Sequence, residues 1–190
     1  MLLRNAGRED FLPLLEGNSQ FMITNTDYRE LAGSQDPKFV VISCSDSRVS
    51  PSIILGAPLG TLFEIRVAGE VVDESVLGSV EFAVENLGTR RILVIGHTSC
   101  GAVTAAYESL KGKMSLQDGS VLSSLVRDIQ GLISRIPGEN LSLDACIRQN
   151  TKGQANKLLR SEAIRKRHVS EELTIGTAVY DLNTGKLDLI

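Results

Sequence analysis

The sequence has little of several residue types on which specialised proteins depend. Its 190 residues include no tryptophan, two histidines and three cysteines, and aromatic residues make up 4% of the chain. Three widely spaced cysteines do not make a disulfide framework, and so few aromatic rings leave little surface for stacking bases. The net charge of -3 also excludes the strongly basic surface that non-specific nucleic-acid binding requires. We therefore expect neither a disulfide-rich scaffold nor a nucleic-acid-binding protein.

Long hydrophobic runs are missing as well. No apolar stretch approaches the roughly 20 residues that a membrane-spanning helix needs. The first ten residues include Glu9 and Asp10 and lack the apolar centre of a signal peptide. We therefore expect a soluble, cytoplasmic protein with no membrane partner, whose cysteines are free thiols or metal ligands. The basic run at 165–168 follows an amphipathic stretch and is interpreted as a solvated helix end.

Short apolar runs separated by a helical pattern predict the fold class. Residues 39–42, 62–67 and 92–95 are rich in apolar and β-branched residues, which is typical of strands buried on both faces. Residues 75–87 show helical spacing of apolar residues and are followed by Gly88, a common residue just beyond a helix end. Strand, helix and strand at this spacing form a βαβ unit, so we predict an α/β fold with a mostly parallel central sheet flanked by helices.

The remaining segments are expected to complete a single domain over the whole chain. Residues 1–34 are predicted to form a helical N-terminal arm, of one or two short helices broken near Gly17. Residues 35–110 are predicted to hold the βαβ core that carries the chemistry. Residues 111–190 are predicted to form a helical region, with an interruption near Gly153, and to end in an edge strand or hairpin.

Soft metal ligands follow two of the predicted parallel strands. Cys44 stands in the loop after the first strand, and His97 and Cys100 stand in the loop after the third. Open α/β sheets bind ligands at the carboxyl ends of their strands, so both loops can open onto one crevice. Two thiolates and one imidazole suit Zn²⁺ and leave a fourth position free for catalysis. By itself, His97-x-x-Cys100 is more often a capping histidine and a buried cysteine, and only its convergence with Cys44 favours zinc.

Asp46 and Arg48 lie two and four residues after Cys44. One interpretation is a loop ion pair, worth 0 to about 1 kcal/mol if it is exposed. In the functional interpretation, Arg48 holds the Asp46 carboxylate by two hydrogen bonds beside the solvent on the zinc. Their contact would then decide whether the metal is open or capped by Asp46. The third cysteine, Cys146, lies in a predicted helix and is interpreted as a small buried hydrophobe.

Together, the two motifs resemble those of the β-class carbonic anhydrases. Cys44-Ser45-Asp46-Ser47-Arg48 matches the C-x-D-x-R motif of that family, and His97-Thr98-Ser99-Cys100-Gly101 matches its H-x-x-C-G motif about fifty residues later. The likeness extends from residue 35 to about residue 103 and, more weakly, over residues 179–186. The helical segment between 121 and 168 adds little to it.

The resemblance implies one zinc ion per chain with Cys44, His97 and Cys100 as its ligands, and Asp46 and Arg48 as a catalytic pair. It implies reversible hydration of CO₂ to bicarbonate and a proton by zinc-bound hydroxide, whose hydrogen Asp46 would accept. Substrate contacts are implied at three further positions, which are Gln35, Phe63 and Gly101. Members of the family are built from dimers, so a homodimer or tetramer is expected.

Some residues depart from the family pattern. Val67 and Glu70 stand where the family commonly has asparagine, so the polar wall of the cleft or a dimer contact is expected to differ. Val41 stands where one regulated subgroup has the tryptophan of a non-catalytic bicarbonate site. We therefore expect no bicarbonate inhibition through that pocket, and we expect Asp46 to pair with Arg48 rather than with zinc.

Other interpretations of the same residues stay open. The fold and metal could serve hydrolysis of carbonyl sulfide or carbon disulfide, which parallel assays of CO₂ hydration and sulfide release would distinguish. The domain could also be an inactive zinc-binding regulatory module, in which an Asp46→Ala substitution would leave zinc content and function intact. Without the resemblance, Gln35 would be interpreted as a polar loop residue before a strand.

Overall fold

A computed structural model describes residues 11–25, 27–115, 117 and 119–190 of the chain. The chain divides into two compact units, residues 1–35 and 36–190, and the predicted end of the N-terminal arm lies one residue before this boundary. Within the described ranges, no helix is both long enough and apolar enough to cross a membrane.

The N-terminal unit is helical. Helix α1 (Leu12–Thr24) has a proline in its first turn, and the 3₁₀-helix η2 (Asp27–Gly33) follows it. The predicted break near Gly17 is wrong, because α1 runs through this residue. A glycine in a helix costs only about 1 kcal/mol relative to alanine and does not end the helix by itself. No residue of α1 is buried, and its exposed side chains include Phe21, Met22 and Ile23.

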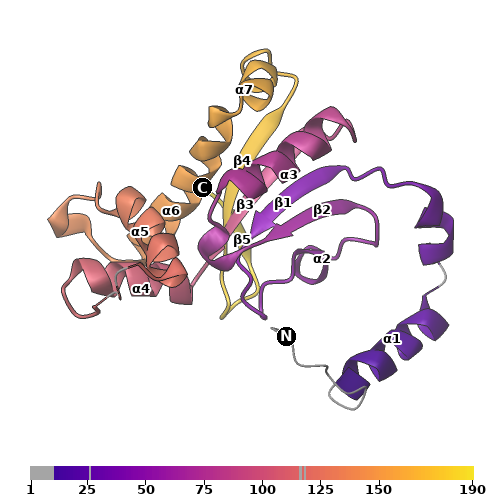
Figure 1. Cartoon of the computed structure of the whole chain (residues 1–190), viewed down its shortest axis with the longest axis horizontal. Helices are drawn as coiled ribbons and strands as arrows, with labels where there is room; N and C mark the ends of the chain where they lie inside the picture. Colours follow the sequence, from indigo (N-terminus) through magenta and orange to yellow (C-terminus); the bar gives the residue numbers. More distant parts are fainter. Residues whose placement is uncertain (1–10, 26, 116, 118) are drawn as a thin grey trace. The chain divides into compact units, whose positions relative to one another are not determined.

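The larger unit is built on a five-stranded sheet with the order β2-β1-β3-β4-β5 (Figure 1). Its strands are β1 (Phe39–Ser43), β2 (Leu62–Arg66), β3 (Arg91–His97), β4 (Thr174–Tyr180) and β5 (Leu187–Leu189). The first four strands are parallel, and β5 alone runs antiparallel, against β4. The predicted mostly parallel sheet and its terminal hairpin are therefore confirmed.

Helices cover the sheet and extend the core beyond its carboxyl edge (Figure 1). These helices are α2 (Pro51–Ile54), α3 (Glu74–Glu85), α4 (Gly101–Leu110), α5 (Val121–Ile133), α6 (Leu143–Lys157) and α7 (Glu162–Val169), with the 3₁₀-helices η3 (Ala68–Glu70), η4 (Gly138–Asn140) and η5 (Leu158–Arg160). Side chains of α3, η5 and α7 form one core with Val40, Ile42 and Val94 of the sheet. A second core joins α4, α5 and α6, and it includes Cys44 and Cys100.

Helix α6 also corrects a prediction. It passes through Gly153 without interruption, and a Cβ atom at this position would lie 2.7 Å from the Leu132 side chain of α5. The glycine therefore allows α5 and α6 to pack closely instead of breaking the helix. The helical region changes direction later, at Ser161, whose side chain accepts a hydrogen bond from the Ile164 N–H and so caps α7.

Candidate metal centre

The parallel register brings the two motif loops to the same edge of the sheet. Ser43, the last residue of β1, pairs with Ile95 of β3, so Cys44 leaves β1 close to the point where His97 ends β3. Ser99 has a positive φ of 57°, which turns the chain sharply and places Cys100 at the start of α4. The ligand side chains thus come from two strand ends and one helix start.

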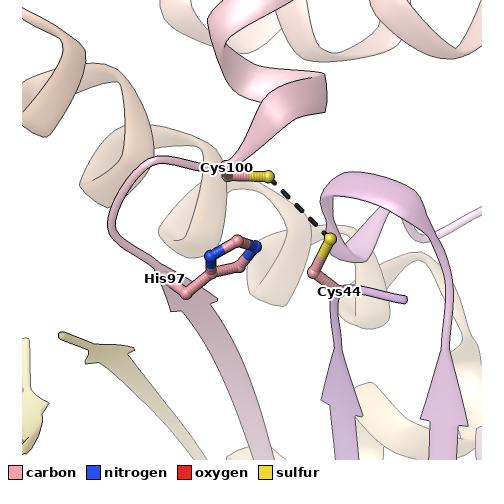
Figure 2. Close-up of side chains that lie close together, drawn as sticks. All are labelled: Cys44, His97 and Cys100. Atoms are coloured by element: carbon pink, nitrogen blue, oxygen red, sulfur yellow. Dashed lines mark hydrogen bonds between the residues drawn. The ribbon is translucent and has the colours of Figure 1, made fainter. Parts of the chain in front are cut away.

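Cys44, His97 and Cys100 form one buried cluster. Figure 2 shows the three side chains pointing toward one another, and their ligand atoms all lie within 4.8 Å of one another. The two sulfur atoms are 3.9 Å apart. The side chains are nearly closed to solvent, with 5%, 0% and 1% of their residue surfaces exposed. The structure therefore brings together the three metal ligands that the sequence predicts.

The geometry of this cluster fits a zinc ion. Two thiolates at about 2.3 Å from a tetrahedral zinc lie about 3.8 Å apart, which is close to the observed separation. His97 Nδ1 lies 2.9 Å from the Thr98 carbonyl oxygen, so this nitrogen is assigned as the N–H donor. His97 Nε2 is then an acceptor, and it is buried with no hydrogen-bond partner among the described residues. A buried lone pair beside two thiols is suited to a cation.

The two cysteines have coupled acidities. A hydrogen bond from the Cys100 thiol lowers the pKa of Cys44, and the Gly69 N–H, which donates to the same sulfur, acts in the same direction. The same contact with Cys44 raises the pKa of Cys100, and burial raises it further. One of the two thiols is therefore easily ionised, while the second keeps its proton until a cation compensates the charge. This behaviour is typical of a metal site, because the ligands must be deprotonated to bind.

Asp46 and Arg48 form the predicted contact next to this cluster. Arg48 Nε donates to Asp46 Oδ1 at 2.9 Å, and Arg48 Nη2 donates to Oδ2 at 2.8 Å. The Arg48 hydrogen bonds hold the pKa of Asp46 well below its ordinary value, so the carboxyl group is ionised at neutral pH. Asp46 Oδ2 lies 4.0 Å from His97 Nε2. The carboxylate is thus fixed at the rim of the cluster.

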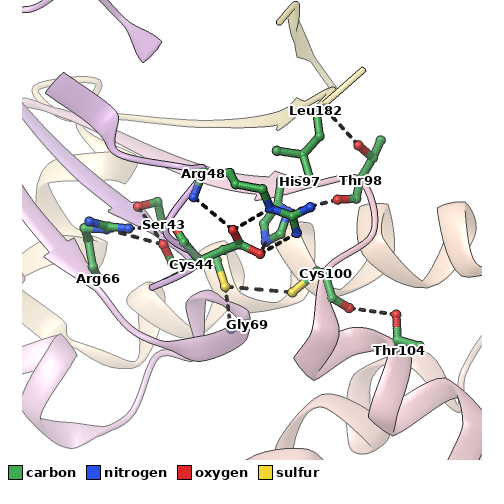
Figure 3. Close-up of polar contacts among 11 residues, drawn as sticks. Ser43, Cys44, Arg48, Arg66, Gly69, His97, Thr98, Cys100, Thr104 and Leu182 are labelled. Atoms are coloured by element: carbon green, nitrogen blue, oxygen red, sulfur yellow. Dashed lines mark hydrogen bonds and ion pairs between the residues drawn. The ribbon is translucent and has the colours of Figure 1, made fainter. Parts of the chain in front are cut away.

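Backbone contacts hold both loops in place (Figure 3). Arg66, at the end of β2, donates from Nη2 to the Asp46 carbonyl oxygen at 2.7 Å. The Thr98 hydroxyl accepts a hydrogen bond from the Leu182 N–H at 3.0 Å, and the Thr98 N–H donates to the Tyr180 carbonyl oxygen. The loop after β1 is therefore held by Arg66 of β2, and the loop after β3 by the last residue of β4 and the segment that follows it.

The three predicted substrate contacts lie in different settings. Gly101 follows Cys100 directly as the exposed first residue of α4, and a Cβ atom there would meet no atom within 4 Å. Phe63 is the second residue of β2, with its ring 6.3 Å from that of Phe82 in α3, so within one chain it is part of the apolar packing. Gln35 is exposed and is the last residue of the N-terminal unit. Their roles in substrate binding stay predictions.

Sequence reasoning missed a buried polar network behind the cluster. Glu70, at a position expected to alter either the polar wall of the cleft or a dimer contact, is fully buried and faces α6, where Asn150 Nδ2 donates to its Oε1 at 2.9 Å. Burial, together with the negative charge of Cys44, raises the pKa of Glu70 to about 8. A signal was present in the sequence, because Asn150, Thr151 and Gln154 are polar residues on one side of a predicted helix, and in the structure this side is buried.

Comparisons with known proteins agree with this architecture. The family model described as Carbonic anhydrase matches residues 39–187. "Carbonic anhydrase 2" of Mycobacterium tuberculosis is 35% identical over 187 residues, which covers 91% of this chain and 87% of the relative. A β-carbonic anhydrase from Coccomyxa, solved in complex with acetazolamide, has a TM-score of 0.81 and 26% identity and covers 95% of this chain and 86% of its own. A tetrameric β-carbonic anhydrase from Sordaria macrospora has a TM-score of 0.81 at 23% identity, and the match covers 96% of this chain and 98% of its own.

Proposed function

The chain belongs to the β class of the carbonic anhydrase family and is an enzyme of that kind, and on this premise we propose that Cys44, His97 and Cys100 hold a zinc ion that serves reversible CO₂ hydration. The observation that carries the proposal is the buried set of two sulfur atoms and one unpartnered imidazole nitrogen within 4.8 Å. Three protein ligands are the number that catalytic zinc sites use, because the fourth position serves the reaction. When bound, zinc lowers the pKa of water from about 15.7 to about 7 and so supplies a nucleophile at neutral pH.

Asp46 acts as an acceptor fixed beside the metal ligands. Both of its carboxylate oxygens receive hydrogen bonds from Arg48, and its lowered pKa keeps it ionised, so it can accept a hydrogen bond and cannot donate one. A group bound next to it must therefore present a hydrogen toward Asp46. This requirement favours water and bicarbonate over ligands without a hydrogen, and it orients the attacking lone pair away from Asp46 and toward CO₂.

We also propose that the protein assembles as a homodimer or tetramer. Helix α1 exposes Phe21, Met22 and Ile23 and buries none of its residues, which favours a partner for this helix. In the larger unit, an apolar cavity of about 420 Å³ lies beside edge strand β2, and its lining includes Phe39 and Leu62. A second copy of the chain would cover such surfaces. Sedimentation velocity of the full chain tests this assembly, and a monomer at micromolar concentration would contradict it.

The thiol ligands also bear on the compartment. All three cysteines are free and buried in the structure, and a zinc site of thiolates is preserved in a reducing environment. We therefore propose a cytoplasmic location. Fractionation of cells that produce the protein at native level tests it, and recovery outside the cytoplasm would contradict it.

The experiment that tests the catalytic proposal is an Asp46→Asn substitution. We expect zinc content and folding to be retained and CO₂ hydration to fall strongly, because an amide can present a donor where the reaction needs an acceptor. The matched control is Asp144→Asn, an exposed aspartate that pairs with Arg148 at the surface of α6. Equal hydration rates in the wild type and Asp46→Asn would contradict the role of Asp46. Release of sulfide from carbonyl sulfide without CO₂ hydration would contradict the choice of substrate.

A further inference from the structure

Glu70 adopts a backbone conformation that the chain must enforce. Its φ is 44°, in the left-handed region that side chains other than glycine rarely adopt. It follows Gly69, whose φ is 66°, so two consecutive residues of the turn η3 are left-handed. The Glu70 side chain is also completely buried. A turn with this strain persists only where its surroundings hold it.

Helix α6 supplies the contacts that hold the turn. The Asn150 side chain donates both of its Nδ2 hydrogens, one to the Glu70 Oε1 atom and one to the Gly69 carbonyl oxygen, each at 2.9 Å. The Thr151 hydroxyl lies 3.2 Å from the same Glu70 oxygen. Gln154 extends the clamp, because its Oε1 accepts a hydrogen bond from the Val72 N–H at 2.8 Å. Three residues of α6 therefore bind the turn η3 and the extended residues that follow it.

The turn held in this way contacts a metal ligand. The Gly69 N–H donates a hydrogen bond to the Cys44 sulfur at 3.4 Å (Figure 3). A Cβ atom at position 69 would lie 2.7 Å from the Ile129 side chain, so the turn has little room to shift. The Gly69 N–H belongs to the Ala68–Gly69 peptide unit. Asn150 of α6 binds both the carbonyl oxygen of Gly69 and the side chain of Glu70, so the far side of Gly69 is held against α6 and the residue cannot turn its N–H away from Cys44 without breaking these contacts.

The hydrogen-bond network behind Glu70 is suited to fixing the position of the turn and not to conducting protons. Asn150 Oδ1 accepts from Gln154 Nε2 at 3.1 Å, and Gln154 Nε2 also donates to Asp128, which pairs with Lys157. The chain from Glu70 toward the surface thus passes through two amide side chains. Amides offer fixed donors and acceptors and have no proton to release at ordinary pH.

We propose that Glu70 is a positioning residue of the metal centre, which anchors the turn at residues 68–70 to α6 so that the Gly69 N–H stabilises the Cys44 thiolate. This inference rests on the zinc function proposed above. Partners that orient metal ligands from behind contribute about 10- to 100-fold to metal affinity. Loss of the anchor should therefore weaken zinc binding by a factor in this range, although Glu70 is not itself a ligand.

Substitutions of Glu70 that change the length and the charge of its side chain separately test the proposal. Glu70→Ala removes the anchor, and Glu70→Asp keeps a carboxyl group on a side chain too short by one methylene. Glu70→Gln keeps the length and the oxygen that accepts from Asn150. Thr89→Val is the matched control, because it removes another buried hydrogen bond, from Thr89 Oγ1 to the Pro37 carbonyl oxygen, before the start of β3 and so at the other end of the strand from His97.

Two measurements on the full chain report on the metal site and do not depend on catalytic activity. Competition with a chelator gives the zinc dissociation constant, and we expect it to rise about 10- to 100-fold in Glu70→Ala and Glu70→Asp and to stay at the wild-type value in Glu70→Gln and Thr89→Val. In the Co²⁺-substituted protein, loss of a hydrogen bond to sulfur raises the energy of the sulfur lone pairs. The sulfur-to-cobalt charge-transfer band should therefore move to longer wavelength in the first two variants only.

The outcomes distinguish this inference from the zinc function itself. If the wild type binds zinc and Glu70→Asp binds it equally tightly with an unmoved band, the positioning role is wrong and the zinc function stands. If Thr89→Val weakens zinc binding as much as Glu70→Asp does, the effect is one of general stability and the inference is also wrong. If the wild type binds no zinc, the function proposed above fails first. Glu70→Asp and Glu70→Gln decide the matter even where Glu70→Ala does not fold.

Discussion

Replacing Glu70 by glutamine should change how the stability of the metal-free protein depends on pH. Burial, together with the charge of Cys44, raises the pKa of Glu70 from an ordinary value of 4.5 to about 8 in the folded protein. Between these pH values the folded protein keeps a proton that the unfolded chain has released, so the free energy of unfolding falls as pH rises. Each pH unit corresponds to about 1.36 kcal/mol, so the loss between pH 4.5 and pH 8 is about 4 kcal/mol.

Glutamine cannot ionise, so the variant should not show this loss. Urea unfolding of both proteins at intervals from pH 4.5 to 8.5, with a chelator and a reductant present, gives the difference between their free energies of unfolding. We expect the wild type to lose stability relative to Glu70→Gln by about 4 kcal/mol over this range, with most of the change between pH 4.5 and 8. Glu139→Gln, an exposed glutamate in η4, reports the effect of the same substitution at the surface.

The decisive quantity is the change with pH in the difference between the two free energies of unfolding. A difference that does not vary with pH reflects only packing and hydrogen bonding. A difference that stays constant across the range would show that Glu70 titrates in the folded protein as it does in the unfolded chain, and the reasoning from its burial would be refuted. A wild type that gains stability relative to the variant as pH rises would refute it as well.

Two further predictions concern close packing and the Asp46 contact. Gly96→Ala places a Cβ atom 2.1 Å from the Thr151 hydroxyl oxygen, so we expect urea unfolding to show a free energy of unfolding lower by about 1 to 3 kcal/mol. In the control Gly78→Ala, the new Cβ atom meets nothing within 4 Å, and the protein should not be destabilised. Equal stability of the two variants would contradict this prediction. Arg48→Lys keeps the charge but cannot reproduce the two parallel hydrogen bonds to Asp46. We therefore expect the rate of CO₂ hydration to fall about 10- to 100-fold at unchanged zinc content. Wild-type turnover in this variant would exclude a positioning role for Arg48.

The cluster of Cys44, His97 and Cys100 could be predicted from sequence because its signal is local. Cys44, His97 and Cys100 each follow or end a short buried strand, and the rule that parallel strands end at one edge of the sheet was enough to bring them together. The Asp46–Arg48 contact could be predicted for a similar reason, because both residues lie in the same short loop.

Features that depend on distant parts of the chain could not be predicted in this way. Gly153 was expected to interrupt a helix, but its role depends on contact with Leu132 of another helix, which the local pattern does not contain. The burial of Glu70 could not be predicted, because nothing near it in sequence indicates that its partner Asn150, eighty residues later, lies behind the turn. The break predicted near Gly17 was wrong because a single glycine is a weak signal when helical residues surround it.

The measurement that tests the central claim most directly is the zinc content per chain together with the rate of CO₂ hydration, before chelation, after it and after zinc is restored. Three buried ligands in one cluster predict one zinc ion per chain, loss of hydration when the ion is removed, and recovery when it is returned. A zinc-free protein that hydrates CO₂ as fast as the untreated one would contradict the account.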